Sequence, residues 1–172
     1  MKYEIIDNFL EPREFNALKG SILDIEFPWF AYSGITESKF GKDGKLSQAL
    51  TKEEHWAFFH LFYQNYQPNS KFFNSLTNLI EKLEIQALLR SKANLYPRTT
   101  EVVEHNFHYD FAEPHKSALL SLNTNNGFTI LGDGTKIESI ENRIVLFDAS
   151  ELHKSTTCSD ANYRANIVIN WK

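Results

Sequence analysis

The spacing of hydrophobic residues predicts two helices in the first half of the chain. Apolar residues recur at intervals of three and four after Pro12, a residue that suits the first helical turn, which predicts a helix over residues 11–24. A second apolar series follows Ser70, a common helix-capping residue, and predicts an amphipathic helix over residues 70–85. Residues 53–64 fit neither the helical nor the strand period. The apolar positions of the two series are Phe15, Leu18, Ile22 and Leu23, and then Phe72, Phe73, Leu76, Leu79, Ile80 and Leu83.

From residue 88 onward the spacing changes to the alternation that is typical of strands. Leu89, Ser91, Ala93 and Leu95 alternate with Arg90, Lys92, Asn94 and Tyr96. Asn126-Gly127 and Asp133-Gly134 carry the two strongest hairpin signals. Further strand-like runs lie at residues 102–103, 117–122, 128–131, 136–140, 143–147 and 163–171, and a short opening strand is expected near residues 5–10. Short strands with such turns predict a β-sandwich or barrel.

These patterns predict a single domain over residues 1–172. Its fold class is α+β and mainly β, with a helical N-terminal part over about residues 1–87 and a β core over about residues 88–172. The sequence contains no repeat, low-complexity tract or interdomain linker. A length of 172 residues is sufficient to bury a core without disulfide bonds or structural metals.

Two segments of the first half remain open in their interpretation. Residues 27–32 are aromatic without a clear period, which favours a core strand and turn over the alternative, a wall of the substrate cleft. Residues 33–47 contain three of the seven glycines and several lysines, which predicts a polar loop.

Composition narrows the function classes. Hydrophobic residues make up 42% of the chain, charged residues 23%, and the formal net charge is −4. Because nucleic-acid affinity rests mainly on Lys and Arg, this balance disfavours a nucleic-acid partner. The one cysteine, Cys158, excludes an intrachain disulfide, and no apolar leader or membrane span is apparent. We therefore expect a cytoplasmic protein without membrane contact; its oligomeric state is left open.

The chemistry of the chain centres on residues 104–111. In a strand, residues two apart point to the same face, so His108 and Asp110 can converge on one point. His153 follows the apolar run 144–147, and Arg164 comes eleven residues later in the terminal strand. Two histidines and one carboxylate on one face of Fe(II) form the facial triad of non-haem oxygenases. We predict that His108, Asp110 and His153 are metal ligands.

Each of these signals is weak alone, because an H-x-D pair is short and His153 by itself is more simply a histidine of a surface loop. The order of the four residues carries the prediction, since Arg164 offers a bidentate fork for the far carboxylate of a diacid such as 2-oxoglutarate. His105, three residues before His108, would point away from the metal on a strand. It is expected to support a ligand or to lie at the surface.

The order H-x-D, then H, then R resembles the Fe(II)- and 2-oxoglutarate-dependent oxygenase superfamily. Within it, the chain looks most like the prolyl 4-hydroxylase-like branch, and especially like small stand-alone members from phages and marine bacteria. The resemblance covers about residues 92–171, half of the chain. It is carried by residues 93–97, 108–111, 122–129 and 142–148, and the opening residues 5–10 are also similar to such proteins.

The resemblance implies a double-stranded β-helix, or jelly-roll, with the N-terminal helices packed on one sheet and the metal between the sheets. It also implies that Arg164 pairs with the distal carboxylate of 2-oxoglutarate, although the branch more often has lysine there. Tyr96 and Thr129 are similar to residues that approach the same co-substrate. Asn166, two residues after Arg164 on the same strand face, is expected to assist.

The implied function is a hydroxylating dioxygenase that uses Fe(II), 2-oxoglutarate and O2, with ascorbate as a candidate further cofactor. The branch favours a prolyl or other residue of a peptide or protein as substrate, and a small molecule is the alternative. The location would be the cytoplasm of a bacterium, or of the host cell if a phage encodes the chain. A non-catalytic or sensor jelly-roll that binds metal and a carboxylate, as in cupins, remains the second hypothesis.

Overall fold

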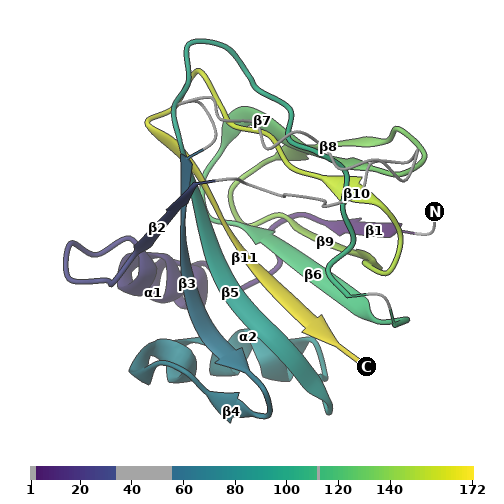
Figure 1. Cartoon of the computed structure of the whole chain (residues 1–172). Helices are drawn as coiled ribbons and strands as arrows, with labels where there is room; N and C mark the ends of the chain where they lie inside the picture. Colours follow the sequence, from purple (N-terminus) through teal and green to yellow (C-terminus); the bar gives the residue numbers. More distant parts are fainter. Residues whose placement is uncertain (1–2, 34–55, 112) are drawn as a thin grey trace.

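The computed structural model describes residues 3–33, 56–111 and 113–172, and the predicted polar loop lies outside these ranges except for its first residue. The described part is mainly β (Figure 1). Its strands are β1 (Tyr3–Ile6), β2 (Phe30–Ser33), β3 (Trp56–Gln64), β4 (Gln67–Pro68), β5 (Leu88–Pro97), β6 (Lys116–Ser121), β7 (Asn125–Leu131), β8 (Lys136–Ser139), β9 (Ile144–Asp148), β10 (His153–Lys154) and β11 (Tyr163–Trp171). Its helices are α1 (Pro12–Ile22), the 3-10 helix η2 (Lys71–Leu76) and α2 (Thr77–Lys82).

The strands form two sheets, as expected for a jelly-roll. The larger sheet has the order β1-β9-β6-β11-β5-β3-β2, with β4 attached to β3, and every pairing in it is antiparallel. The smaller sheet has the order β10-β7-β8. Residues of both sheets line one cavity, so the inner faces of the sheets enclose it. The predicted double-stranded β-helix is confirmed.

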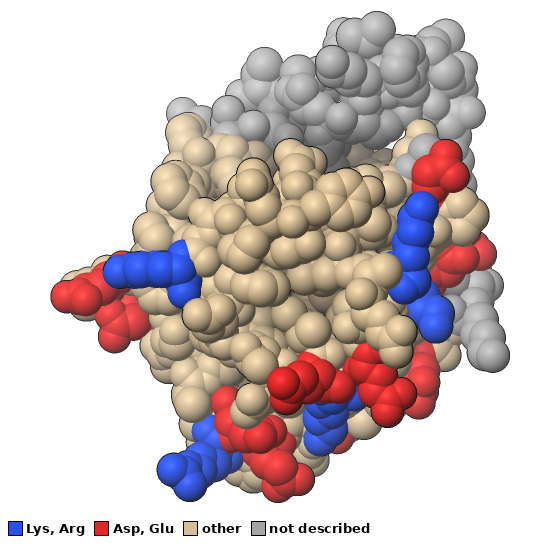
Figure 2. Space-filling view, turned by 90° about the horizontal axis from the view of Figure 1, so that it is seen from below, with Lys and Arg blue, Asp and Glu red and all other residues tan. Residues whose placement is uncertain are grey.

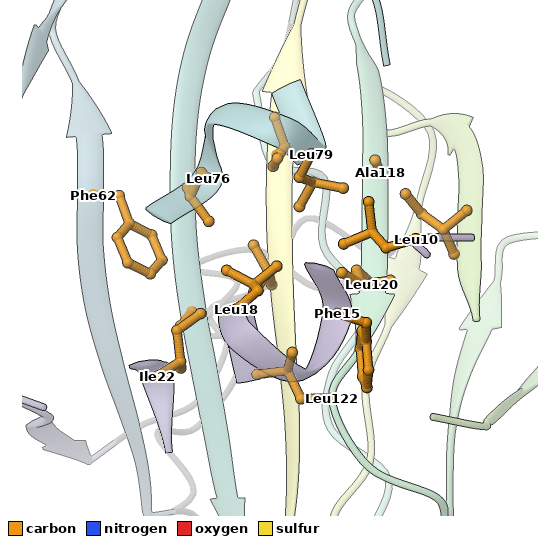
Figure 3. Packing of buried hydrophobic residues seen from close by; sticks show 14 of the residues in the cluster. Leu10, Phe15, Leu18, Ile22, Phe62, Leu76, Leu79, Ala118, Leu120 and Leu122 are labelled. Atoms are coloured by element: carbon orange, nitrogen blue, oxygen red, sulfur yellow. The ribbon is translucent and has the colours of Figure 1, made fainter. Parts of the chain in front are cut away.

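The helices pack on the outer face of the large sheet (Figure 3). Leu18 and Ile22 of α1 lie over the sheet with Leu76 and Leu79 from η2 and α2, and all four are almost fully buried. Burying a side chain of this size contributes about 1.5–3 kcal/mol. The strand residues that meet them alternate along the sheet, namely Ala118, Leu120, Leu122, Ala165, Ile167 and Ile169. The intervening strand residues face the other sheet.

The N-terminal part is not purely helical, which corrects the expected division near residue 87. Strand β3 pairs with β5 inside the large sheet, and β1 pairs with β9 at its edge. The first predicted helix is confirmed, but the second begins as the 3-10 helix η2 before the short α2. Buried and partly exposed residues do not alternate regularly along β3. This irregular burial explains why its sequence fitted neither the helical nor the strand period.

The two hairpin signals have different outcomes. Asp133-Gly134 forms the predicted turn between β7 and β8, where Gly134 has a positive φ of 90° that favours glycine. Asn126-Gly127 does not form a turn, because both residues lie inside β7. The Gly127 position is instead required by close packing, as the site below explains.

The aromatic segment 27–32 belongs to the core and to an edge strand. Phe27 is buried against the rings of His60, Phe62 and Phe72, and Phe30 on the edge strand β2 is 55% exposed. The core interpretation holds for Phe27 but not for the strand, since β2 is an exposed sheet edge. Among the described residues, none of this segment lines the cavity between the sheets.

Two further features are the length of the helices and the distribution of charge on the surface. No helix in residues 3–33, 56–111 and 113–172 is long and apolar enough to cross a membrane. Figure 2 shows one face on which basic and acidic side chains lie along the left, right and lower margins, with a largely uncharged centre.

Candidate metal centre

The backbone brings two histidines together between the sheets. His108 and His153 form an isolated antiparallel bridge, in which each backbone N–H donates to the other's carbonyl oxygen at 2.9 and 2.8 Å. Their rings then lie 4.5 Å apart between centroids. Residues 104–111 are therefore extended but not a regular strand, because only isolated bridges tie them to residues 153–156.

Both imidazoles use the same nitrogen, Nδ1, in contacts with backbone carbonyl oxygens. The Nδ1 of His153 lies 3.0 Å from the carbonyl oxygen of Glu151, and the Nδ1 of His108 lies at 3.5 Å from that of Asn106. These contacts favour protonated Nδ1 atoms and leave each Nε2 as a lone-pair donor. Burial and the neighbouring histidine lower the pKa of His108 to about 3, and burial lowers the pKa of His153. Both rings are neutral at pH 7, as metal ligation requires.

Asp110 is held as an anion beside them. Arg90 donates to its Oδ1 at 2.5 Å, and Asn170 donates to its Oδ2 at 2.8 Å. Burial alone would raise the pKa of Asp110, but the charges of Arg90 and Lys92 outweigh burial and hold this pKa well below its usual range. The ligand atoms of His108, Asp110 and His153 all lie within 4.8 Å of one another.

The donor set fits the metal that the sequence implies. Two neutral imidazole nitrogens and one carboxylate oxygen are the ligands of the non-haem Fe(II) facial triad, which leaves further coordination positions open. The geometry therefore brings together the three residues predicted as ligands.

Arg164 is the largest fully buried side chain of the described residues, with 1% exposure. Its Nε donates to Ser139 Oγ at 2.8 Å, one terminal nitrogen to the carbonyl oxygen of Thr156 at 3.3 Å, and the other to Thr129 Oγ1 at 2.9 Å. The guanidinium carbon lies 5.5 Å from the ring centroid of Tyr96. All of these neighbours are neutral.

The charge of Arg164 consequently has no anionic partner in the described part of the chain. None of the ion pairs among residues 3–33, 56–111 and 113–172 includes it, and burial lowers its pKa. A buried cation without a counter-ion costs several kcal/mol in desolvation. Five N–H donors with three protein contacts leave capacity for an anion.

Gly127 makes room for this arginine. A Cβ at that position would lie 2.5 Å from the backbone oxygen of Thr157 and 2.7 Å from Cδ of Arg164. Glycine inside a strand often marks such a close approach. The Asn-Gly pair that looked like a turn therefore shapes the arginine pocket.

One cavity joins the three candidate ligands to the surroundings of Arg164. Its lining includes both histidines, the aspartate, and the predicted co-substrate residues Tyr96, Thr129 and Asn166. Thr129 and Tyr96 also contact Arg164, as described above. Asn166 accepts a hydrogen bond from Asn94 at 2.9 Å, so it is fixed in the wall. Whether these three side chains touch a co-substrate remains a prediction.

Several site residues escaped the sequence prediction. Arg90 and Asn170 bind the candidate ligand Asp110, Ser139 binds Arg164, and Asn94 and Lys92 line the cavity. The alternation of polar residues in residues 90–96 was the available signal, because it marks one strand face as polar.

His105 lies within the fold and not at the surface. It is 3% exposed, its Nδ1 lies 2.8 Å from Ser155 Oγ, and its ring is 5.2 Å from that of Tyr96. Ser155 also bonds the Tyr96 side chain, and burial raises the pKa of Tyr96. Of the two expectations for His105, the surface position is wrong.

No family model matches the sequence, and no curated protein is significantly similar to it. Solved structures do match over nearly the whole chain. A prolyl-4-hydroxylase from Pseudomonas putida aligns with a TM-score of 0.63 and 14% identity, covering 99% of this chain and 91% of its own. A prolyl hydroxylase from Trichoplax adhaerens aligns with a TM-score of 0.67 and 14% identity, covering 98% of this chain and 83% of its own. Its structure is a complex with a peptide fragment of the hypoxia inducible factor oxygen degradation domain.

A third match carries the relevant ligands. HygX from Streptomyces hygroscopicus, with nickel and 2-oxoglutarate bound, aligns with a TM-score of 0.59 and 8% identity, covering 98% of this chain and 82% of its own. The chain has the fold of these three proteins. At such identities the likeness concerns the oxygenase fold, and the reaction has to be argued from the side chains of the site.

Proposed function

We propose that this chain is an Fe(II)- and 2-oxoglutarate-dependent dioxygenase that hydroxylates its substrate, acting as one domain over residues 1–172. The observation that carries the proposal is the buried Arg164, whose charge has no carboxylate partner in the described residues, beside a cavity lined by His108, Asp110 and His153. A metal triad alone would also suit other reactions. A triad beside a buried cation without a counter-ion favours a co-substrate that chelates the metal and carries a further carboxylate, as a 2-oxo diacid does.

One group of residues would bind the metal and another would bind the co-substrate. His108, Asp110 and His153 would hold Fe(II), and Arg90 with Asn170 would orient the carboxylate. Arg164 would pair with the distal carboxylate of 2-oxoglutarate, with Tyr96 and Thr129 beside it. When bound, Fe(II) and 2-oxoglutarate supply the oxidation, in which O2 converts 2-oxoglutarate to succinate and CO2 and one oxygen atom enters a substrate C–H bond. The fold positions these groups around the cavity.

The substrate class is the open part of this function. The Trichoplax prolyl hydroxylase binds a peptide, which supports a peptide or protein residue as one substrate class. The fold itself does not decide between a peptide and a small molecule, because one fold hosts many specificities.

The test is turnover without added substrate. Purified protein with Fe(II), 2-oxoglutarate and O2 should form succinate slowly, and Asp110→Ala should abolish both succinate formation and Fe(II) retention. Circular dichroism controls for the fold of the variant. Tight binding of metal and 2-oxoglutarate without any succinate would refute the enzyme assignment and favour a binding protein.

A further inference from the structure

Lys92 is a cationic side chain on the wall of the metal cavity. It extends from the inner face of β5, two residues from Arg90 and two from Asn94, and lines the cavity with the three candidate ligands. The side chain is half-buried. Its charge helps to keep Asp110 ionised, but its ammonium has no assigned partner in the metal ligation or in the diacid site.

No carboxylate in residues 3–33, 56–111 and 113–172 forms an ion pair with the Lys92 ammonium. Asp110 is near enough for its charge to favour protonated Lys92, but the Asp110 oxygens bind Arg90 and Asn170. Burial, with the charge of Arg90, lowers the pKa of Lys92 to about 8. The amine therefore remains mostly protonated at pH 7.

A second lysine on the cavity wall provides the contrast. Lys154 also lines the cavity, but its Nζ lies 2.7 Å from Oε2 of Glu104, so its charge is already compensated. Fe(II) would further neutralise Asp110, and 2-oxoglutarate would satisfy Arg164. Lys92 would then be the cavity cation that still lacks an anion.

We propose that Lys92 binds an anionic group of the primary substrate, so that the substrate is a carboxylate- or phosphate-bearing small molecule. This inference rests on the proposed function, because it concerns the substrate of that same site. An anion that accepts hydrogen bonds from a partly desolvated ammonium compensates for the hydration that the ammonium has lost. A neutral peptide segment would leave the charge uncompensated.

The test compares matched charged and neutral probes. One arm uses N-acetyl amino acids against their carboxamides, and the other uses nucleoside 5′-monophosphates against nucleosides. Binding is measured by saturation-transfer NMR on protein loaded with Zn(II) and 2-oxoglutarate, and stimulation of succinate formation is measured with Fe(II). In at least one of the two arms, the charged probe should bind about tenfold to 100-fold more tightly than its neutral partner.

Three variants make the test specific. Lys92→Met should remove the preference for the charged probe, Lys92→Arg should keep most of it, and Lys154→Met, with the same change in net charge, should keep it fully. Absence of a charge preference in both arms, or its survival in Lys92→Met, would overturn the inference. Succinate formation by wild-type protein with Fe(II) and 2-oxoglutarate separates this failure from failure of the proposed function, because that turnover tests the dioxygenase assignment and does not depend on the charge of the primary substrate.

Discussion

Replacing Gly127 with alanine should weaken 2-oxoglutarate binding without touching a metal ligand. The new methyl group would lie 2.7 Å from Cδ of Arg164 and 2.5 Å from the backbone oxygen of Thr157, where ordinary contacts begin near 3.4 Å. Both contacts are shorter than 3.0 Å, so the Thr157 backbone and the arginine stem both have to shift, the stem by about 0.7 Å, from 2.7 to 3.4 Å. Gly127 does not have a positive φ, so the effect is purely steric.

Two magnitudes follow from this displacement. Overpacking of this kind costs about 1–3 kcal/mol of folding stability. Loss of one well-aligned charge-assisted hydrogen bond costs about 1.5–3 kcal/mol, which corresponds to a roughly 10- to 150-fold higher Kd for 2-oxoglutarate. The affinity for Fe(II) should change little, because the candidate metal ligands come from other segments of the chain.

The assay is anaerobic titration of the Fe(II) protein with 2-oxoglutarate, followed through the visible charge-transfer band, with a thermal melt of each variant. Gly20→Ala is the matched control, since a Cβ at Gly20 has no neighbour within 4 Å and alanine favours the helix α1. An unchanged Kd for 2-oxoglutarate in Gly127→Ala would refute the assignment of the arginine pocket as the diacid site.

Three further predictions concern the metal ligands and the fold. Arg90→Met should weaken Fe(II) binding about 10- to 100-fold, whereas Arg143→Met should not; equal Fe(II) affinities in a competition assay would argue against carboxylate orientation by Arg90. The apo protein should lose stability as pH falls from 7 to 5, by about 2 kcal/mol from His108 alone, because a lowered native pKa lets the unfolded chain bind more protons; denaturant titrations that do not depend on pH would contradict this. Asn142→Ala should cost about 2–4 kcal/mol, because the Asn142 side chain bonds both the N–H and the carbonyl of Leu10 at 3.0 and 2.8 Å; a melting temperature within 2 °C of wild type would count against that role.

Periodicity predicted most elements whose two faces differ. The helix α1 has one apolar face, and β5 alternates between the helix layer and the cavity, so both were readable from the sequence. Strand β3 was not, because its inward and outward positions are both partly buried and mostly aromatic. The 3-10 start of the second helical segment was also missed, since apolar spacing does not distinguish it from an α-helix.

The candidate ligands were predictable because His108 and Asp110 form a short H-x-D motif, and His153 and Arg164 follow it in a recognisable order. Their supporting residues were not, because Arg90 and Asn170 meet Asp110 across 20 and 60 positions of the chain. Alternation marked Lys92 as part of a polar strand face, but the pattern does not tell whether a polar face meets water or a cavity. That difference separates a surface lysine from a substrate-binding lysine.

The most direct test of the account compares 2-oxoglutarate with 2-oxovalerate, which has the same chain length but no distal carboxylate. In anaerobic Fe(II) protein, 2-oxoglutarate should bind far more tightly, and Arg164→Met should reduce its affinity to that of 2-oxovalerate while Fe(II) binding persists. Equal affinities of the two acids for wild-type protein, or undiminished 2-oxoglutarate binding by a folded Arg164→Met variant, would contradict the account.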